Sequence, residues 1–223
     1  MTKGVSINVA SSSQNPTGRG PVYPSDFSFE YLPIPEENET IEKVPTYAEL
    51  EWITQENITT SDKPVHLDPE FETYTYGHAE RGFGDINSLM GLEEGDYLFF
   101  HSTLDNKHDP SEWLTAIIGY FEIEKVIDCR EFSSSEIKEM DRFENNAHLK
   151  RKDSGVDLLI SGTEDSKLLE KCIPLSSFED SRKLRDEFKE LVRTPTGKKI
   201  NDGSPWFRWT LKVTEPEKIL EMR

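Results

Sequence analysis

Two long apolar segments dominate the hydrophobic pattern in the middle of the chain. The first, YLFFHS, ends at Ser102, and the second, WLTAIIGYFEIEKVID, begins at Trp113. A polar stretch around residues 106–110 separates them. Apolar runs rich in aromatic and β-branched residues, with a short polar connection, are typical of paired strands. The pattern therefore predicts a central antiparallel hairpin.

Three shorter segments also have the composition of strands. Residues 4–10 are β-branched and weakly alternating, residues 27–31 are mainly aromatic, and residues 156–160 form a compact apolar run. Residues 11–24 contain Ser, Asn, Pro and Gly at the density of a loop. We expect a strand in each of the three segments and a long polar loop after the first.

Helical signals are confined to short stretches. Ser133 and Glu136 have the spacing of a capping box ahead of apolar residues at helical intervals, and further short helices are expected at 45–53 and 166–174. The clearest amphipathic pattern begins at Asp180. Its apolar positions are Leu184, Phe188, Leu191 and Val192.

Strands and short helices alternate without regular βαβ units. This arrangement predicts an α+β fold with a mixed, mostly antiparallel sheet, or a partly open barrel, flanked by short helices. A length of 223 residues permits one well-buried core, and we expect residues 1–223 to form a single domain. The aromatic content of 10% is too high for a disordered chain, although 31% of the residues are charged.

The net charge of −17 limits the kinds of partner that the protein can bind. Affinity for a nucleic-acid backbone comes mainly from Lys and Arg displacing counterions, and here 26 basic residues face 43 acidic ones. A long nucleic-acid groove is therefore disfavoured. A small pocket for one base or nucleotide remains possible, because it needs only a few local cations.

Several familiar motifs are missing from the sequence. It contains no glycine-rich phosphate loop, GxGxxG, HExxH or GxSxG motif, and Cys129 and Cys172 have no zinc-ligand or CxxC spacing. The first residues do not have the pattern of a signal peptide, and no apolar run approaches the ~18 residues of a membrane span. We expect a cytoplasmic protein with no membrane association, metal or cofactor.

The central hairpin resembles that of PUA-like domains, which include the EVE and ASCH domains. The similar segments are GDYLFFHS and AIIGYFEIEKVID. This resemblance implies a PUA-like core at about residues 91–177, with the remaining N-terminal and C-terminal residues packed on it.

A second resemblance covers the chain from roughly Ser6 to Leu211. Besides the hairpin and a Trp-rich segment near residue 206, it rests on these segments, in this order: GPVYPSDFSFEYLPIPE, VHLDPEF, ENNAHLKR and DLLISGTEDSKLLEKCIPLS. Together they resemble the nucleotide-modification-associated domain, type 3. At residues 10–14 the chain departs from the expected opening, reading ASSSQ. The resemblance implies a setting in nucleic-acid modification or DNA conflict systems.

His66 and Asp68 are candidate catalytic residues. They are two positions apart, so in an extended segment both side chains face the same side and can hydrogen-bond a ligand or each other. In an enzyme they would transfer protons. The alternative is a turn held by Asp68, with His66 paired to the backbone.

The segment TYTYGHAERGFGD combines aromatic rings, a cation and hydrogen-bonding groups, the mixture that a base pocket needs. Its candidate ligand-binding residues are Tyr76, His78, Arg81 and Phe83. Arg81 is the favoured contact for an anion or a base. The alternative is a loop that packs its own aromatic side chains.

The other candidate ligand-binding residues are scattered along the chain. They are Arg19 and Tyr23 as parts of a lid, His101 and Ser102 at the PUA-like pocket rim, Asn146 and His148 beside a basic cluster that could meet a phosphate, and Trp206 as a stacking platform. For the last three groups there is a structural alternative: a surface histidine, charge near a helix end, or a core aromatic residue.

Three functions remain open at this stage. The first is a binding protein for a nucleotide or a modified base in DNA or RNA, acting in a modification or defence system with possible protein partners. The second is an enzyme that acts on a nucleotide or base through His and Asp acid–base chemistry, with His66, Asp68, His78 or Asp85 in these roles. The third is an acidic interaction subunit without a small-molecule site. A convergent histidine–carboxylate pair beside a pocket, and a product that is lost when either member is substituted, would favour the enzyme.

Overall fold

The computed structural model describes residues 2–9, 19–54, 62–79, 86–153 and 155–222. Its main element is a mixed sheet in which seven strands follow the order β10-β11-β1-β6-β7-β8-β5, while β2 pairs with β6 and β9 pairs with β7. The strands are β1 (Gly4–Asn8), β2 (Pro21–Val22), β5 (Thr75–His78), β6 (Tyr97–Asn106), β7 (Trp113–Asp128), β8 (Leu158–Gly162), β9 (Lys167–Pro174), β10 (Val192–Arg193) and β11 (Leu211–Val213). A separate two-stranded sheet contains β3 (Ile34–Pro35) and β4 (Val65–His66).

The central hairpin is confirmed as β6 and β7. The two strands pair antiparallel over their length, with a register shift between Phe100 and His101. Successive side chains of a strand point to opposite faces, and here Phe99 and Phe100 are both fully buried. The hairpin is therefore covered on both faces, which explains its nearly continuous apolar sequence.

The pairing of the other strands gives the sheet its mixed character. Strands β1 and β2 run parallel to β6, whereas every other described pair is antiparallel. The described strands form an open sheet and not a closed barrel. The α+β fold class with a mostly antiparallel sheet is thus confirmed.

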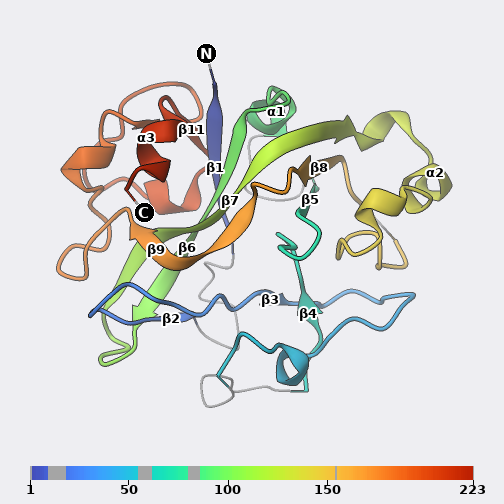
Figure 1. Cartoon of the computed structure of the whole chain (residues 1–223), viewed down its shortest axis with the longest axis horizontal. Helices are drawn as coiled ribbons and strands as arrows, with labels where there is room; N and C mark the ends of the chain where they lie inside the picture. Colours follow the sequence, from blue (N-terminus) through green and yellow to red (C-terminus); the bar gives the residue numbers. More distant parts are fainter. Residues whose placement is uncertain (1, 10–18, 55–61, 80–85, 154, 223) are drawn as a thin grey trace.

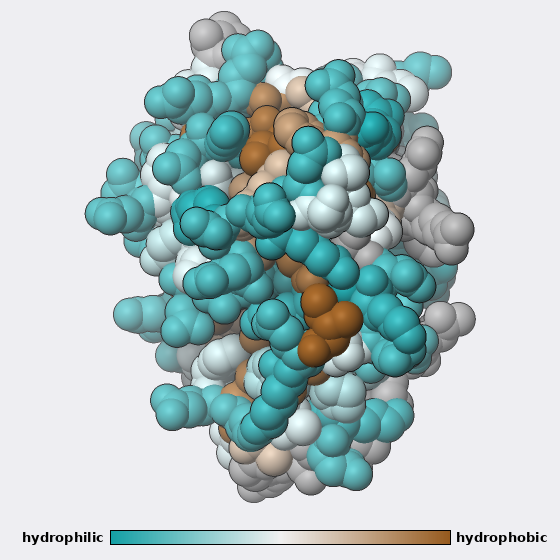
Figure 2. Space-filling view, turned by 90° about the vertical axis from the view of Figure 1, so that its right-hand side faces the viewer, coloured by the Kyte–Doolittle hydropathy of each residue, from teal (hydrophilic) through white to brown (hydrophobic). Residues whose placement is uncertain are grey.

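Two hydrophobic cores lie on the two faces of the sheet. One contains Phe100, Leu98 and Phe121, and the other contains Phe99 and Trp206. Figure 1 shows β6 and β7 crossing the centre of the molecule, with β11 and α3 on one side and α2 on the other. Figure 2 shows a face covered mainly by hydrophilic side chains, as expected from the high charge.

The helices of the described residues are short. They are α1 (Ile86–Met90), α2 (Ser134–Lys138) and α3 (Pro216–Leu220), with 3₁₀ turns η1 (Tyr47–Glu49), η3 (Cys129–Glu131), η4 (Asp141–Phe143), η5 (Asp186–Phe188) and η6 (Trp206–Arg208). The capping box before α2 is confirmed, since Ser133 and Glu136 bond reciprocally. The helix expected at 45–53 is reduced to the single turn η1. No helix in the described part of the chain has the length and apolarity needed to cross a bilayer.

Three predictions of local structure are wrong. Residues 167–174 form β9 and not a helix, because their backbone pairs with β7. The apolar positions after Asp180 are buried, but the segment contains only turn η5 and strand β10. Residues 27–31 make isolated bridges and no strand, and the positive φ of 60° at Phe27 interrupts the extended backbone.

Candidate functional site

Side chains from three separate segments meet beside the small sheet. We call this group the buried polar cluster, and it consists of Glu36, His66, Asp68, Asn146, His148 and Arg151. Strand pairing explains part of the arrangement, because β3 and β4 place Ile34 opposite His66. Farther along, Thr40 bridges to Arg151. These backbone contacts hold Glu36 between the histidine and the arginine.

Glu36 and His66 form the most buried pair of the cluster. Oε2 of Glu36 is 2.7 Å from Nδ1 of His66, and it also accepts a hydrogen bond of 2.9 Å from Nε of Arg151. Burial raises the pKa of Glu36, but the hydrogen bonds from His66 and Arg151 outweigh it and hold the pKa well below its ordinary value. Glu36 is therefore a buried carboxylate.

The Glu36 contact determines the tautomer of His66. A carboxylate can only accept, so Nδ1 of His66 carries the proton and Nε2 keeps a lone pair. Nη2 of Arg151 lies 3.1 Å from the same Nδ1, but the contact to Glu36 is shorter and joins a donor to an acceptor. Burial lowers the pKa of His66, so its ring is neutral at pH 7.

One carboxylate oxygen of Asp68 is held by two hydrogen bonds, and the other faces His148. Its Oδ1 accepts hydrogen bonds from the backbone N–H of Gly77 at 2.7 Å and from Nδ2 of Asn146 at 3.1 Å. Its Oδ2 is 3.4 Å from Nε2 of His148. The side chain of Asp68 thus links β5 to the segment that follows η4.

His148 completes the centre of the cluster. Its ring meets that of His66 edge to face, with 4.9 Å between the centroids, and its Nδ1 is 3.3 Å from Nη1 of Arg151. Asn146 accepts a hydrogen bond from the backbone N–H of His148. One nitrogen or oxygen atom from each of His66, Asp68 and His148 lies within 4.8 Å of the others, so these three side chains could hold a metal ion.

Tyr76 and His78 border the cluster from β5. The hydroxyl of Tyr76 is 3.0 Å from Nδ1 of His78, while Nε2 of His78 is buried without a hydrogen-bond partner among the described residues. Burial lowers the pKa of His78 and raises that of Tyr76, and the charge of Asp68 also raises the latter. The imidazole of His78 and the phenol of Tyr76 are therefore neutral neighbours of the cluster.

Gly77 lets the segment after η4 approach β5 closely. A Cβ at this position would lie 2.6 Å from Cδ2 of His148 and 2.9 Å from Oδ1 of Asn146. Real Cβ atoms essentially never come so close to a neighbouring atom. The absence of a side chain at Gly77 is therefore a condition for the contact between Asp68 and its partners.

The structure brings together six candidates that the sequence had suggested in three separate segments: His66, Asp68, Tyr76, His78, Asn146 and His148. Sequence reasoning missed Glu36 and Gly77 and considered Arg151 only as part of a basic cluster. Glu36 lies in the Pro-rich segment LPIPE, in which nothing marks it as a partner of His66. Its position two residues beyond Ile34, which pairs with His66, becomes visible only in the fold.

Other candidates lie elsewhere. His101 is fully buried in β6, where its Nδ1 contacts Oγ of Ser6 at 2.7 Å, and burial lowers its pKa to about 4. Ser102 is also buried in β6. Trp206 is fully buried and donates from Nε1 to the carbonyl of Arg182 at 2.7 Å. None of these contacts involves the buried polar cluster.

The proposed lid residues are held by local contacts. Arg19 forms an ion pair of 2.9 Å with Asp105 and stacks over the ring of Trp113, and Tyr23 contacts Glu30 at 3.5 Å. Arg81, Phe83 and Asp85 lie outside the described residues. Their predicted roles stay predictions.

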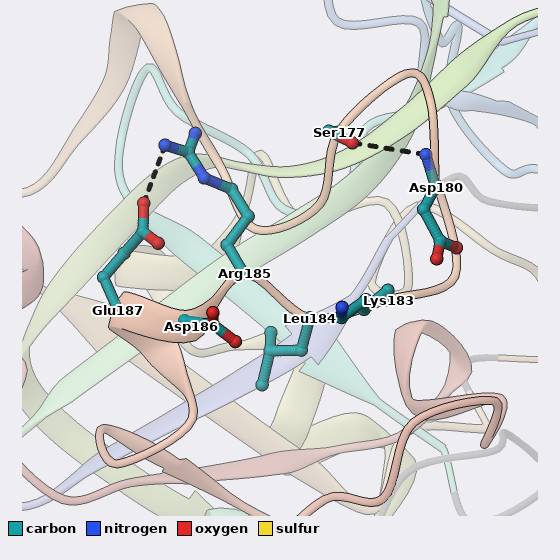
Figure 3. A pocket seen from close by; sticks show the side chains of 7 residues that line it. All are labelled: Ser177, Asp180, Lys183, Leu184, Arg185, Asp186 and Glu187. Atoms are coloured by element: carbon teal, nitrogen blue, oxygen red, sulfur yellow. Dashed lines mark hydrogen bonds and ion pairs between the residues drawn. The ribbon is translucent and has the colours of Figure 1, made fainter.

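A surface hollow of about 230 Å³ lies in a different part of the chain (Figure 3). Its lining residues are Ser177, Asp180, Lys183, Leu184, Arg185, Asp186 and Glu187. Arg185 and Glu187 form an ion pair across part of it. It contains no residue of the buried polar cluster, and its charges of both signs define no particular ligand.

Comparison with known proteins gives one result. A family model described as "Nucleotide modification associated domain 3" matches residues 3–219, nearly the whole chain. No curated protein and no solved structure shows a significant match. The match confirms the second resemblance found in the sequence.

Proposed function

Because the chain belongs to the nucleotide modification associated domain 3 family, we propose that it is an enzyme that modifies a nucleotide or a nucleic-acid base at the buried polar cluster. The observation that carries the proposal is the convergence of two histidines and two carboxylates from distant segments. A convergent histidine–carboxylate pair is one part of the feature by which the sequence analysis separated an enzyme from a binding protein.

The free-energy cost of the cluster supports a chemical role. Burial of charged and polar groups costs several kcal/mol per ion unless each group is well paired, and apolar residues of similar volume often stabilise a fold as well or better. Six such groups occupy one place here, and the pKa of His66 and that of Glu36 depart from their ordinary values. Groups of this kind gather at functional sites.

The arrangement suits polar chemistry on a base. His66 presents a lone pair on Nε2 while Glu36 fixes its orientation, as a carboxylate does for the histidine of a catalytic triad. Asp68 presents one oxygen to the same centre, and Tyr76 and His78 add neutral hydrogen-bonding groups. The strongly negative net charge favours a free nucleotide or a single unstacked base as substrate over a long duplex.

The proposal is tested by a search for altered nucleosides. The purified protein is incubated with deoxynucleotides, ribonucleotides, and single-stranded and duplex oligonucleotides, with and without a small-molecule cell extract as a source of co-substrates. Products are digested to nucleosides and analysed by mass spectrometry. We expect a nucleoside of new mass that His66→Gln and Asp68→Asn abolish, and that His108→Gln, a change at an exposed histidine, leaves unaffected.

Each other outcome rejects part of the proposal. A nucleotide that raises the melting temperature without giving a product would support a binding protein instead. A product that forms equally well with His66→Gln and Asp68→Asn would show that the chemistry occurs elsewhere. If the protein neither binds a nucleotide nor forms a product, the results favour the interaction subunit.

A further inference from the structure

We propose that His66, Asp68 and His148 bind a divalent transition-metal ion, with Glu36 and Asn146 orienting the ligands. The role of this metal rests on the proposed function, because the metal would lie at the centre of the same site. The metal binding itself is a separate measurement. Two imidazoles and one carboxylate form a donor set suited to Zn²⁺, Fe²⁺, Co²⁺ or Ni²⁺, whereas Mg²⁺ and Ca²⁺ prefer oxygen ligands alone.

One of the separations fits such an ion directly. Three potential ligand atoms, one per side chain, lie within 4.8 Å of one another. Nε2 of His148 and Oδ2 of Asp68 are 3.4 Å apart, which is the edge of a tetrahedron with metal–ligand bonds of about 2.1 Å. The same separation is long for a hydrogen bond between charged groups, which is usually about 2.7–2.9 Å. The pair is thus better placed to share an ion than to bond directly.

Outer contacts prepare two of the ligands. A metal-binding histidine typically donates its other ring N–H to a carboxylate or carbonyl, and Nδ1 of His66 makes this contact to Glu36 at 2.7 Å. A metal-binding carboxylate is typically held by hydrogen bonds, and Oδ1 of Asp68 accepts them from Gly77 and Asn146. Nε2 of His66 and Oδ2 of Asp68 therefore remain as the ligand atoms.

The charges of the cluster also favour a cation. Glu36 and Asp68 contribute two negative charges, and Arg151 contributes the one permanent positive charge of the six residues. A buried charge without compensation is costly, so a divalent ion would find an excess of negative charge. Arg151 occupies one side of Glu36 and leaves Asp68 to the metal.

His148 must change its tautomer when the metal binds. The guanidinium of Arg151 can only donate, so in the metal-free protein Nδ1 of His148 accepts and Nε2 carries the proton. Coordination through Nε2 requires the proton to sit on Nδ1 instead, and the guanidinium of Arg151, which can only donate, must then move away from that nitrogen. His78 follows Gly77, whose backbone N–H binds Asp68, and its buried Nε2 lacks a partner among the described residues.

The test uses the full chain stripped with a chelator and titrated with Zn²⁺ or Co²⁺. We expect about one equivalent to bind, Co²⁺ to give visible absorption bands, and Zn²⁺ to displace it. His148→Gln and Asp68→Asn should abolish stoichiometric binding. Glu36→Gln should weaken it about 10–100-fold, as the loss of an outer contact does. His108→Gln is the control, and circular dichroism checks that each variant is folded.

A second measurement uses only the wild-type protein, so its result does not depend on whether the variants fold. X-ray absorption of the zinc-loaded wild-type protein should show nitrogen and oxygen ligands that include two imidazoles and no sulfur. The inference is overturned if the folded wild-type protein binds no metal, if folded Asp68→Asn and His148→Gln still bind one equivalent, or if the absorption shows sulfur ligands. Base modification by fully stripped protein would reject the metal and keep the proposed function. Metal binding without any base modification would keep the metal site and reject the proposed function.

Discussion

Glu36 accepts a hydrogen bond of 2.7 Å from Nδ1 of His66, and the side chains of both residues are almost completely buried. His66 lies in β4 and Glu36 directly follows β3, in a sheet that has only two residues in each strand. Glu36 also binds Arg151 in the segment after η4. The geometry of the candidate site therefore depends on a small sheet that side-chain contacts tie to the rest of the protein.

Replacing Glu36 by Gln should destabilise the protein strongly. The change leaves the Arg151 guanidinium, which is 17% exposed, without its charged partner, and breaking a buried ion pair costs about 3–5 kcal/mol. Glu39→Gln is the matched control, because Glu39 pairs with Lys152 at the surface, where such pairs contribute about 0–1 kcal/mol. Denaturant unfolding measures both. Equal effects of the two substitutions would contradict the role assigned to Glu36.

Gly77→Ala should destabilise the protein and the buried polar cluster, although it adds only one methyl group. The added Cβ collides with His148 and Asn146, and overpacking of this kind costs about 1–3 kcal/mol. The metal affinity should fall together with the stability, because both collisions involve the cluster. Gly91→Ala, where the nearest atom is 3.4 Å away, should change stability by less than about 1 kcal/mol. A fully stable Gly77→Ala protein with unchanged metal affinity would refute this prediction.

His101 should make stability fall as the pH is lowered. Burial holds its pKa at about 4 in the folded protein, against about 6.5 when unfolded. The unfolded state thus binds the proton first, so stability is full above about pH 6.5 and is lost progressively as the pH falls towards 4. The difference corresponds to about 3 kcal/mol over this range.

The measurement is denaturant unfolding at several pH values between 7 and 4. His101→Gln should flatten the profile in this range, although His66 and His78, whose pKa values burial also lowers, leave part of the slope in place. His108→Gln is the exposed control and should leave the profile unchanged. If His101→Gln and wild type have parallel profiles, the buried ring does not contribute as described.

Cys129 and Cys172 should be unreactive in the folded protein. Both are buried, and burial raises the pKa of each thiol to about 12. At pH 8 roughly one part in ten thousand is thiolate, the reactive form. A chromogenic disulfide reagent should therefore label neither cysteine until denaturant is added, and then label both. Rapid labelling of the native protein would contradict the burial of these residues.

Prediction from the sequence succeeded where the local pattern of residues favours the same element that the tertiary structure contains. The β6–β7 hairpin was predicted because both faces of it are buried, which makes the segment apolar throughout. The capping box at Ser133 and Glu136 was predicted because it needs only residues three positions apart. The single-domain organisation and the PUA-like core stay predictions.

Helix prediction failed where apolar periodicity had another cause. Leu184, Phe188 and Leu191 all reach the same core, but they do so from turns and short irregular segments. Residues 167–174 alternate too weakly to be recognised as a strand, and the edge of β7 decides their structure. Periodicity in these segments reports burial, and the partner that buries them lies far away in the sequence.

The candidate site was predicted in pieces. The motifs at His66, His78 and His148 were recognised separately, because each contains polar groups in an unusual local setting. Nothing local connects them, since their contacts arise from the pairing of β3 with β4 and of β5 with β8. Glu36 and Gly77 could not be identified at all, because their importance depends entirely on residues that approach them from other segments.

The position of β1 has a consequence for synthesis of the chain. Gly4 in β1 pairs with Val213 in β11, the last of the described strands in chain order, while the other edge of β1 pairs with β6. During translation β1 leaves the ribosome before the other described strands, but one of its edges has no neighbour until β11 follows. Exposed strand edges invite pairing with other chains. The nascent protein must therefore protect a strand that the finished protein places inside its sheet.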